Sequence, residues 1–162
     1  MDGSVPSGCE MVIGTRADPV AIVAQVCDPE LPFLSIVDLG IVRSIDIEGH
    51  LVTVTITPTY SGCPAMEAIR SDISEALVDG GFKAAVRTVL DPAWTTDDIT
   101  AQGRQLLASN GVAPPALPAT VSCPRCAAAS PRMVSEFGST ACKALMVCSS
   151  CGEPFDHFKQ LR

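Results

Sequence analysis

Four of the eight cysteines form two pairs, Cys123-Pro-Arg-Cys126 and Cys148-Ser-Ser-Cys151, separated by 21 residues. Thiolates at this spacing converge on one cation at Zn–S distances of about 2.3 Å, and two such pairs complete a tetrahedron. The separation lies just beyond the usual window of about 15–20 residues for a zinc site. Two disulfides or a dithiol redox pair are the alternatives, but redox CxxC motifs open a helix in a βαβ unit and neither pair does so here. The spacing therefore predicts a structural zinc ribbon that binds Zn²⁺ through these four cysteines.

The neighbours of the two pairs refine this prediction. Gly152 follows the second pair, where a turn around sulfur often needs a positive φ, whereas the first pair is followed by the less suitable Ala127. Cys142 and His157 lie close by in sequence. Because the pairs already fill four ligand positions, Cys142 is interpreted as a packing residue or auxiliary thiol, and His157 as a surface histidine rather than a substitute ligand.

A further candidate thiol is Cys63, in the segment Thr57-Pro-Thr-Tyr-Ser-Gly-Cys63-Pro64 between an expected strand and an expected helix. We expect Cys63 at the N-cap of that helix, where the backbone N–H groups favour a thiolate that can act as a nucleophile or soft-metal ligand. A small residue that fills a tight turn is an equally good interpretation. Three carboxylates precede it in one loop and are candidates for a metal or proton site, although such residues more often cap turns: Asp28, Glu30 and Asp38.

The elements that would position Cys63 follow from periodicity. Asp18-Pro19 predicts a helix through about Val26, and alternation on either side of Gly49 predicts a β-hairpin. Apolar residues at helical spacing predict a helix from Pro64 to Gly80, followed by a strand at 83–90 and a helix from Thr96 to about Ser109. The order α-β-β-α-β-α predicts an α+β fold: a small mixed three-stranded sheet with covering helices, whose second and third strands are parallel, then a β zinc ribbon. Trp94 is expected to cover the sheet edge.

Composition sets boundaries on this architecture. We expect a flexible tail at 1–16, an α/β module at 17–110, a proline-rich linker at 111–120 and the ribbon at 121–162. Residues 1–118 carry 6 basic and 15 acidic side chains, net −9, and residues 119–162 carry 5 and 3, net +2. An acidic body argues against nucleic-acid binding, and no stretch approaches the roughly 20 apolar residues of a membrane span. A cytoplasmic protein is expected, because reducing cytosol favours cysteines used for metal.

At these residues a family resemblance becomes specific. Asp28-Pro-Glu, Asp38-Leu-Gly-Ile-Val and Thr59…Gly62-Cys63-Pro64 resemble the small iron–sulfur assembly family of bacterial SufT and the eukaryotic cytosolic iron–sulfur targeting subunit, over about residues 18–109. That resemblance implies a reactive Cys63, supported by Asp28, Glu30, Asp38 and Thr59, as a transient ligand for iron or an Fe–S cluster. The C-terminal run, with both CxxC pairs and Ser135–Leu145, resembles the PaaD (PaaJ) family of D subunits associated with bacterial phenylacetyl-CoA epoxidase, a multicomponent di-iron monooxygenase.

The resemblance implies a supporting, non-catalytic role. The chain has two histidines, no Glu-x-x-His pair and no glycine-rich dinucleotide motif, so it lacks the groups of a di-iron oxygenase or a flavin reductase. The leading hypothesis is a maturation factor for the oxygenase or its Fe–S flavin reductase. The alternatives are a stably bound structural or regulatory subunit, and a thiol redox protein that uses Cys63 with Cys142 or Cys27. A homodimer remains open.

Overall fold

The computed structural model describes residues 17–129 and 131–161, so the expected tail at 1–16 lies outside the described residues. The chain divides into two compact units, Met1–Trp94 and Thr95–Arg162. The first unit contains a two-stranded and a three-stranded sheet, and the second contains a four-stranded sheet. The α+β class with a mixed three-stranded sheet is confirmed.

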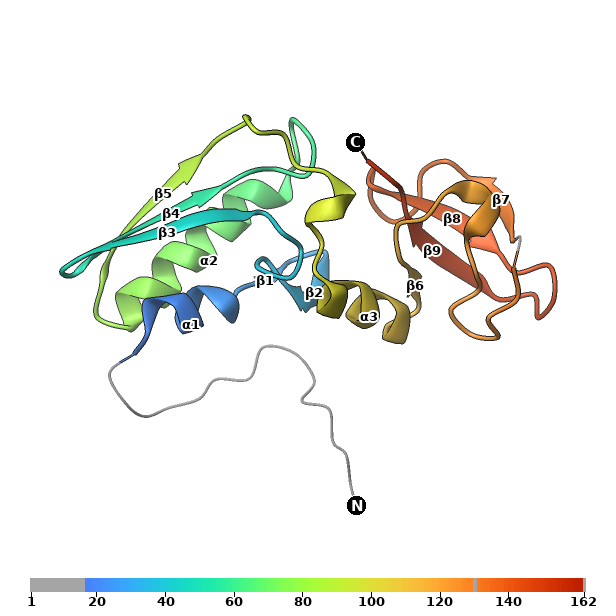
Figure 1. The fold of residues 1–162 in the computed structure, drawn as a ribbon, viewed down its shortest axis with the longest axis horizontal. Coiled ribbons are helices and arrows are strands. Elements are labelled where there is room, and N and C mark those ends of the chain that lie inside the picture. Colours follow the sequence, from blue (N-terminus) through green and yellow to red (C-terminus); the bar gives the residue numbers. More distant parts are fainter. Residues whose placement is uncertain (1–16, 130, 162) are drawn as a thin grey trace, which may run out of the picture. The chain divides into compact units, whose positions relative to one another are not determined.

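The three-stranded sheet of the first unit has the order β3-β4-β5. β3 (Val42–Glu48) and β4 (Leu51–Ile56) form the predicted antiparallel hairpin around Gly49, whose φ is +63°. β5 (Lys83–Thr88) pairs with β4 in parallel. The parallel connection is made by the 15-residue helix α2 (Ala65–Asp79), which lies with α1 (Pro19–Ala24) on one face of the sheet (Figure 1).

The core of this unit lies between that face and the helices. Val52, Val54 and Ile56 of β4 are fully buried, and α2 buries Ile69, Ile73 and Leu77 toward them at helical spacing. Each such side chain contributes about 1.5–3 kcal/mol on burial. In the register of the sheet, the threonines of β4 share the opposite face with the polar residues of β3 and the basic residues of β5. The period-2 alternation read from the sequence is therefore confirmed.

The segment before β3 differs from the expected loop. β1 (Cys27–Asp28) and β2 (Leu31–Ser35) form a short antiparallel hairpin. Pro32 is tolerated in β2 because a two-stranded sheet uses only one side of the strand for its hydrogen bonds. The hairpin buries Leu31 and Leu34, and its turn is held by Asp28, whose Oδ1 accepts from the backbone N–H groups of Glu30 and Leu31.

The second unit begins with a short 3-10 turn and a separate α-helix, where the sequence predicted a single helix. Thr95 caps a short 3-10 turn at Thr96–Asp98, the chain extends at Ile99, and Thr100 then caps α3 (Ala101–Ser109) by accepting from the backbone N–H of Gly103. Two threonine caps five residues apart start two separate helical segments. The prediction of one helix that starts at Thr96 is corrected accordingly.

The rest of this unit is a four-stranded sheet in the order β6-β9-β8-β7. The strands are β6 (Val112–Ala113), β7 (Arg132–Ser135), β8 (Lys143–Val147) and β9 (Pro154–Phe158), and a 3-10 turn occupies Pro118–Thr120. β6 is parallel to β9, and its two residues are buried. The start of the expected linker is thus β6, a strand of the ribbon sheet. This strand ends at two prolines, which have no backbone N–H to donate.

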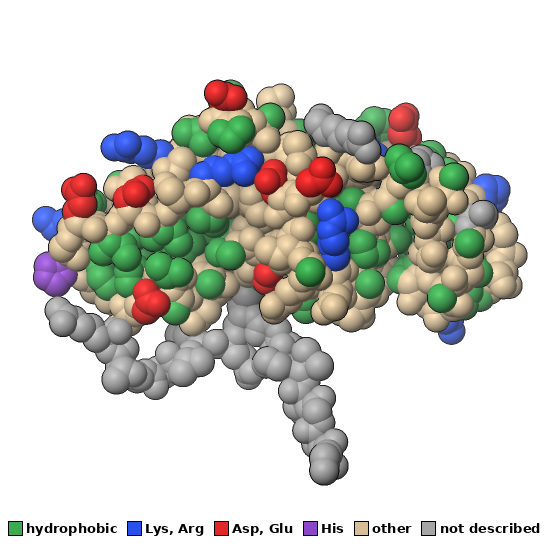
Figure 2. Space-filling model, viewed as in Figure 1, with side chains coloured by type: hydrophobic (Ala, Val, Ile, Leu, Met, Phe, Trp, Pro, Cys, Tyr) green, Lys and Arg blue, Asp and Glu red, His purple; other side chains and the backbone are tan. Residues whose placement is uncertain are grey.

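The division of the structure between Trp94 and Thr95 also places α3 with the ribbon rather than with the α/β module. No helix among residues 17–129 and 131–161 is long and apolar enough to cross a membrane. On the visible face of the first unit, acidic and basic side chains of the described residues are interspersed without a continuous basic field (Figure 2).

Candidate metal centre and functional site

The two CxxC turns have the same backbone design. In the first, the N–H of Ala127 donates to the carbonyl of Cys123 (2.9 Å), and in the second, the N–H of Gly152 donates to the carbonyl of Cys148 (3.0 Å). Both residues have positive φ, +60° for Ala127 and +76° for Gly152. The expectation that Ala127 stands where glycine fits better is therefore confirmed at the backbone.

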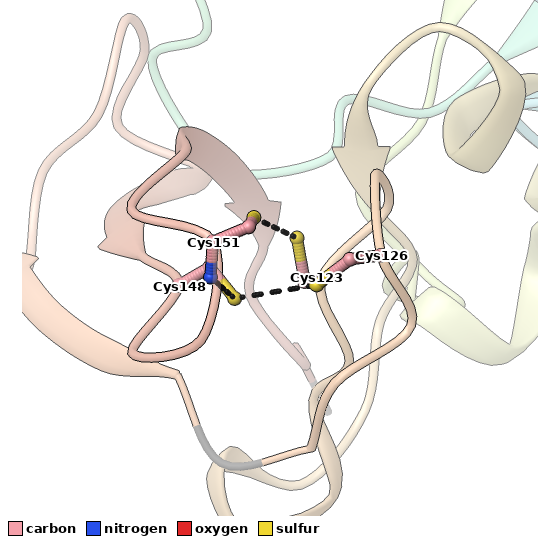
Figure 3. Close-up of side chains that lie close together, drawn as sticks. All are labelled: Cys123, Cys126, Cys148 and Cys151. Carbon is pink, nitrogen blue, oxygen red and sulfur yellow. Dashed lines mark hydrogen bonds between the residues drawn. The ribbon is translucent and has the colours of Figure 1, made fainter.

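These turns bring the four sulfur atoms together (Figure 3). The Sγ atoms of Cys123, Cys126, Cys148 and Cys151 all lie within 4.8 Å of one another, and none is in a disulfide. The Sγ–Sγ distance is 3.8 Å for Cys123 and Cys151, and 3.6 Å for Cys126 and Cys148. A tetrahedron of sulfurs about 2.3 Å from a central cation has edges of about 3.8 Å. The donor set and its spacing fit a tetrahedral thiolate-bound metal ion.

Backbone N–H groups in the second CxxC turn lower the pKa of one of its thiols. The N–H groups of Cys151 and Ser150 lie 3.4 Å from Sγ of Cys148 and, as the main cause, lower the pKa of Cys148 to about 6. The backbone N–H of Ala128 lowers the pKa of Cys126, but the bonds of this thiol to Cys148 and Cys151 outweigh it and raise that pKa to about 12. A bound cation would replace the protons that the crowded sulfurs otherwise share.

The four-cysteine group lies partly in the core of the ribbon and partly at its surface. Cys123 and Cys148 are buried in an apolar cluster with Val121, Met146 and Phe155, whereas Cys126 and Cys151 are exposed. On the exposed side, Arg125 of the first turn pairs with Glu153, which follows the second turn. The cluster fixes one cysteine of each pair, and the ion pair links the two turns directly.

Cys142 and His157, which lie near the cysteine pairs in sequence, do not belong to the four-cysteine group. Cys142 is buried and its Sγ lies 3.0 Å from Oγ1 of Thr140, outside the four-cysteine group. His157 is only 4% exposed, so its assignment as a surface histidine is wrong. Its place in β9, between Ala113 of β6 and Ala144 of β8, explains this burial. Burial lowers the pKa of His157, and its Nε2 has no hydrogen-bond partner among the described residues.

Cys63 lies in the connection from β4 to α2, at the carboxyl end of β4, and is half-buried. Pro64, not Cys63, is the N-cap of α2, so the expected N-cap position of Cys63 is wrong by one residue. Pro64 already has helical dihedral angles, and the carbonyl of Cys63 accepts from the N–H of Met66 (3.3 Å) in a tight first turn. The Cys63 thiol is not in a disulfide.

The carboxylates named with Cys63 are engaged in local turns. Asp28 is buried and holds the β1–β2 turn, and Oδ2 of Asp38 accepts from Oγ of Ser35 (3.1 Å). Glu30 is exposed, and Thr59 is half-buried. Within the described parts of the chain, the four-cysteine group is the only cluster of three or more Cys, His, Asp or Glu side chains at metal-binding distances. Cys63 therefore does not form such a cluster with two of these carboxylates.

Two further residues of the first unit have buried polar side-chain atoms that the sequence did not predict. Trp94 is buried and its Nε1 donates to the carbonyl of Leu39 (2.9 Å), next to Asp38. Thr57, directly after β4, is 1% exposed, and its Oγ1 has no hydrogen-bond partner among the described residues. Thr57 continues the alternation of Thr53 and Thr55 along the strand, and this pattern alone does not predict that its hydroxyl is buried.

Each unit contains a region that matches the model of a known protein family. Residues 20–89 match the model of the family described as iron–sulfur cluster assembly protein, and residues 109–159 match that of the PaaD zinc beta ribbon domain. An Escherichia coli (strain K12) protein, provisionally named as the D subunit of 1,2-phenylacetyl-CoA epoxidase, is 50% identical over 147 residues, covering 86% of this chain and 89% of the relative. The chain belongs to this PaaD family.

Two other relatives match about half of the chain. A Porphyromonas gingivalis (strain ATCC BAA-308 / W83) protein named Fe-S protein maturation auxiliary factor is 33% identical over 86 residues, covering 51% of this chain and 81% of the relative. The crystal structure of a domain of unknown function, DUF59, from Bacillus anthracis is 29% identical, with a TM-score of 0.50. The match covers 55% of this chain and 87% of the Bacillus anthracis chain. This chain thus combines a module of the iron–sulfur assembly family with a PaaD zinc ribbon.

Proposed function

We propose that this chain is a maturation factor of the phenylacetyl-CoA epoxidase system, which assists insertion of iron or an Fe–S cluster into the oxygenase or its Fe–S flavin reductase. The observation that supports this most is the iron–sulfur assembly module at residues 20–89 inside a member of the PaaD family. A protein named as an Fe–S maturation factor shares this module. Both histidines lie in the sheet or a hairpin turn, which offers no scaffold for a di-iron centre.

Cys63 is the residue that we assign to transfer. It is half-buried, outside any disulfide, and placed at the carboxyl edge of the sheet, where strand-to-helix connections present functional groups. Cys63 does not belong to a complete set of metal ligands. An ion bound through this thiol would keep free ligand positions, and a partner protein could occupy these positions and take over the ion. Asp28 and Asp38 would then act by holding the β1–β2 turn and the turn after β2, where their carboxylates accept hydrogen bonds.

The metal content of the chain itself tests this assignment. Protein purified without air is expected to carry zinc together with some iron, and Cys63→Ala should lose the iron while the zinc remains. Cys142→Ala is the matched control, because Cys142 is another cysteine outside the four-cysteine group. Equal iron in the native protein and in Cys63→Ala would remove Cys63 from the transfer path.

In the ribbon, we propose one structural Zn²⁺ bound by Cys123, Cys126, Cys148 and Cys151. Two of these cysteines belong to the small core of the sheet, so metal binding and folding are coupled. Cys148→Ser should therefore unfold the ribbon sheet and leave the first unit folded, as read from amide chemical shifts. Native-like ribbon shifts in metal-free protein would contradict a structural metal.

A second candidate is a structural or regulatory component that stays bound to the oxygenase, favoured by the name of the Escherichia coli relative, which describes a subunit. Stoichiometry separates the two candidates. A maturation factor restores partner activity at far less than one equivalent, whereas a bound component remains at fixed stoichiometry during turnover. The thiol redox alternative has less support, because Cys27 is in a disulfide that involves neither Cys63 nor Cys142, and these two cysteines are not joined to each other.

A further inference from the structure

The two cysteines of each CxxC pair differ in their access to solvent. The first of each pair, Cys123 or Cys148, is buried in the apolar cluster of the ribbon, whereas the second, Cys126 or Cys151, is exposed. An ion that passed through the apolar cluster would lose its hydration without gaining polar partners. A metal ion therefore enters and leaves the four-cysteine group on the side of Cys126 and Cys151.

An ion pair joins the two cysteine turns on this exposed side. Arg125 lies directly before Cys126, and its Nη1 donates to Oε2 of Glu153, which lies two residues after Cys151. The side chains of Arg125 and Glu153 are 68% and 39% exposed, so the pair lies at the surface of the ribbon. The two segments that carry the exposed thiols are therefore connected to each other directly.

The backbone at both ends of the ion pair is fixed by hydrogen bonds. Across the first turn, which contains Arg125, the N–H of Cys123 donates to the carbonyl of Ala128 (2.9 Å). In the second turn, the carbonyl of Glu153 accepts from the N–H of Cys148 (2.9 Å). Formation of the pair therefore costs mainly the rotamer freedom of two side chains, and the pair transmits any separation of the turns to both backbones.

The guanidinium of Arg125 also lies close to sulfur. The hydrogen bond and the charge of Glu153 raise the pKa of Arg125 most, and the charges of Cys151 and Cys123 raise it further. Four thiolates around a divalent cation have a net charge of roughly −2, so a guanidinium beside them is favourable. Arg125 can thus act as one end of a link between the turns, or as a positive charge beside the thiolates.

Release of a metal ion requires a thiolate to move away from it. Cys123 and Cys148 are held in the apolar cluster, so the exposed Cys126 and Cys151 are the thiolates that can move in a local opening of the turns. The ion pair opposes this opening, because it holds the segment before Cys126 against the segment after Cys151.

We propose that the Arg125–Glu153 ion pair controls the rate of metal exchange at the four-cysteine group by holding the two exposed thiols together. This inference rests on the proposed Zn²⁺ site of the ribbon and is independent of transfer through Cys63. The link between the turns, and not the positive charge of Arg125 alone, sets the rate. Because exposed ion pairs contribute modestly, the link slows exchange by a factor of a few.

The experiment measures the release of Zn²⁺ from the full-length, zinc-loaded chain to an excess of a chromogenic chelator. Arg125→Gln and Glu153→Gln should each accelerate release about 2–5-fold, and the double variant should be no faster than either single variant. Arg125→Glu combined with Glu153→Arg should return toward the native rate, because the link is restored with its charges exchanged. Arg132→Gln is the matched control, since Arg132 is exposed in the same unit, and its release rate should be native.

Two further measurements separate this link from a general effect on folding. Salt at about 1 M should accelerate release from the native chain and affect Arg125→Gln less, because screening weakens an exposed ion pair. Amide hydrogen exchange in β8 and β9 should be the same in Arg125→Gln as in the native chain, since the link acts on the cysteine turns and not on the sheet.

The contrary outcomes are distinct. Native release rates for Arg125→Gln and Glu153→Gln, at full zinc content, would overturn the inference. Faster release from Arg125→Gln with slower release from Glu153→Gln would also overturn it, because the positive charge beside the thiolates would then set the rate. Loss of β8–β9 protection by the same factor as the gain in release would overturn it in favour of a structural contact. A native chain that binds no Zn²⁺ would overturn the proposed metal site together with this inference.

Discussion

At the scale of single residues, Ala127 and Gly152 occupy equivalent positions in the two cysteine turns but differ in their fit to the backbone. Both follow the second cysteine of a pair and have positive φ. A residue with a Cβ atom loses roughly 1–2 kcal/mol in this region, whereas glycine does not. The first turn therefore stores backbone strain that the second turn avoids.

Exchanging the two residue types should change stability in opposite directions. Gly152→Ala is expected to destabilise the zinc-loaded ribbon by about 1 kcal/mol, and since no atom lies within 4 Å of the added Cβ, the cost comes from the backbone alone. Ala127→Gly should stabilise it by up to about 1 kcal/mol, because relief of strain exceeds the added entropy of the unfolded chain. Denaturant unfolding at fixed zinc concentration measures both. Destabilisation by Ala127→Gly would mean that Ala127 is not strained.

At the scale of elements, much of the first unit was predictable because its signals are local. Alternation in the β3–β4 hairpin, the helical spacing of Ile69, Ile73 and Leu77, and the parallel β4–β5 pair all follow from patterns within one or two elements. The β1–β2 hairpin was missed because Pro32 argues against a strand, and only the absence of a second neighbour strand makes it acceptable.

The second unit was less predictable because its contacts are distant in sequence. β6 pairs with β9, more than 40 residues later, so two residues before a proline run gave no local sign of a strand. The four-cysteine group was identifiable because the spacing of its two pairs alone predicts the geometry, and the sulfur distances agree with that prediction. The position of Cys63 relative to the helix start depends on one residue of local geometry, which sequence patterns do not resolve.

The burial of His157 in β9 makes the stability of this sheet depend on pH. Burial lowers its pKa in the folded protein, whereas the unfolded chain takes up a proton near the usual value of about 6.5. The unfolded state therefore binds more protons below this pH, and stability that is present above about pH 6.5 is lost as the pH falls toward the lower folded-state pKa.

His157→Phe should flatten this pH dependence, because the protonatable group and its unpartnered Nε2 are both removed. Urea unfolding of the ribbon between about pH 7.5 and 5 gives the comparison, with the exposed His50 replaced by Phe as the control. Cysteine protonation also weakens metal binding in this range, but it affects all three proteins alike. Parallel profiles for native protein and His157→Phe would show that His157 does not contribute.

At the scale of the whole molecule, the chain joins two units that suit different tasks. The first, Met1–Trp94, carries the iron–sulfur assembly module and the Cys63 thiol. The second, Thr95–Arg162, carries the four-cysteine centre and the Arg125–Glu153 ion pair. In the proposed account, the assembly module hands over the cargo to a component of the epoxidase system, of which the Escherichia coli relative is named as a subunit.

The iron and cluster occupancy of the epoxidase components tests this account most directly. The oxygenase components and the reductase would be produced with the native chain, with Cys63→Ser, and without the chain, and their iron measured after purification without air. We expect the partners to accumulate in all three cases but to be fully occupied only with the native chain, and sub-stoichiometric native chain to restore activity. Fully metallated, active partners made without the chain or with Cys63→Ser would contradict a role in maturation.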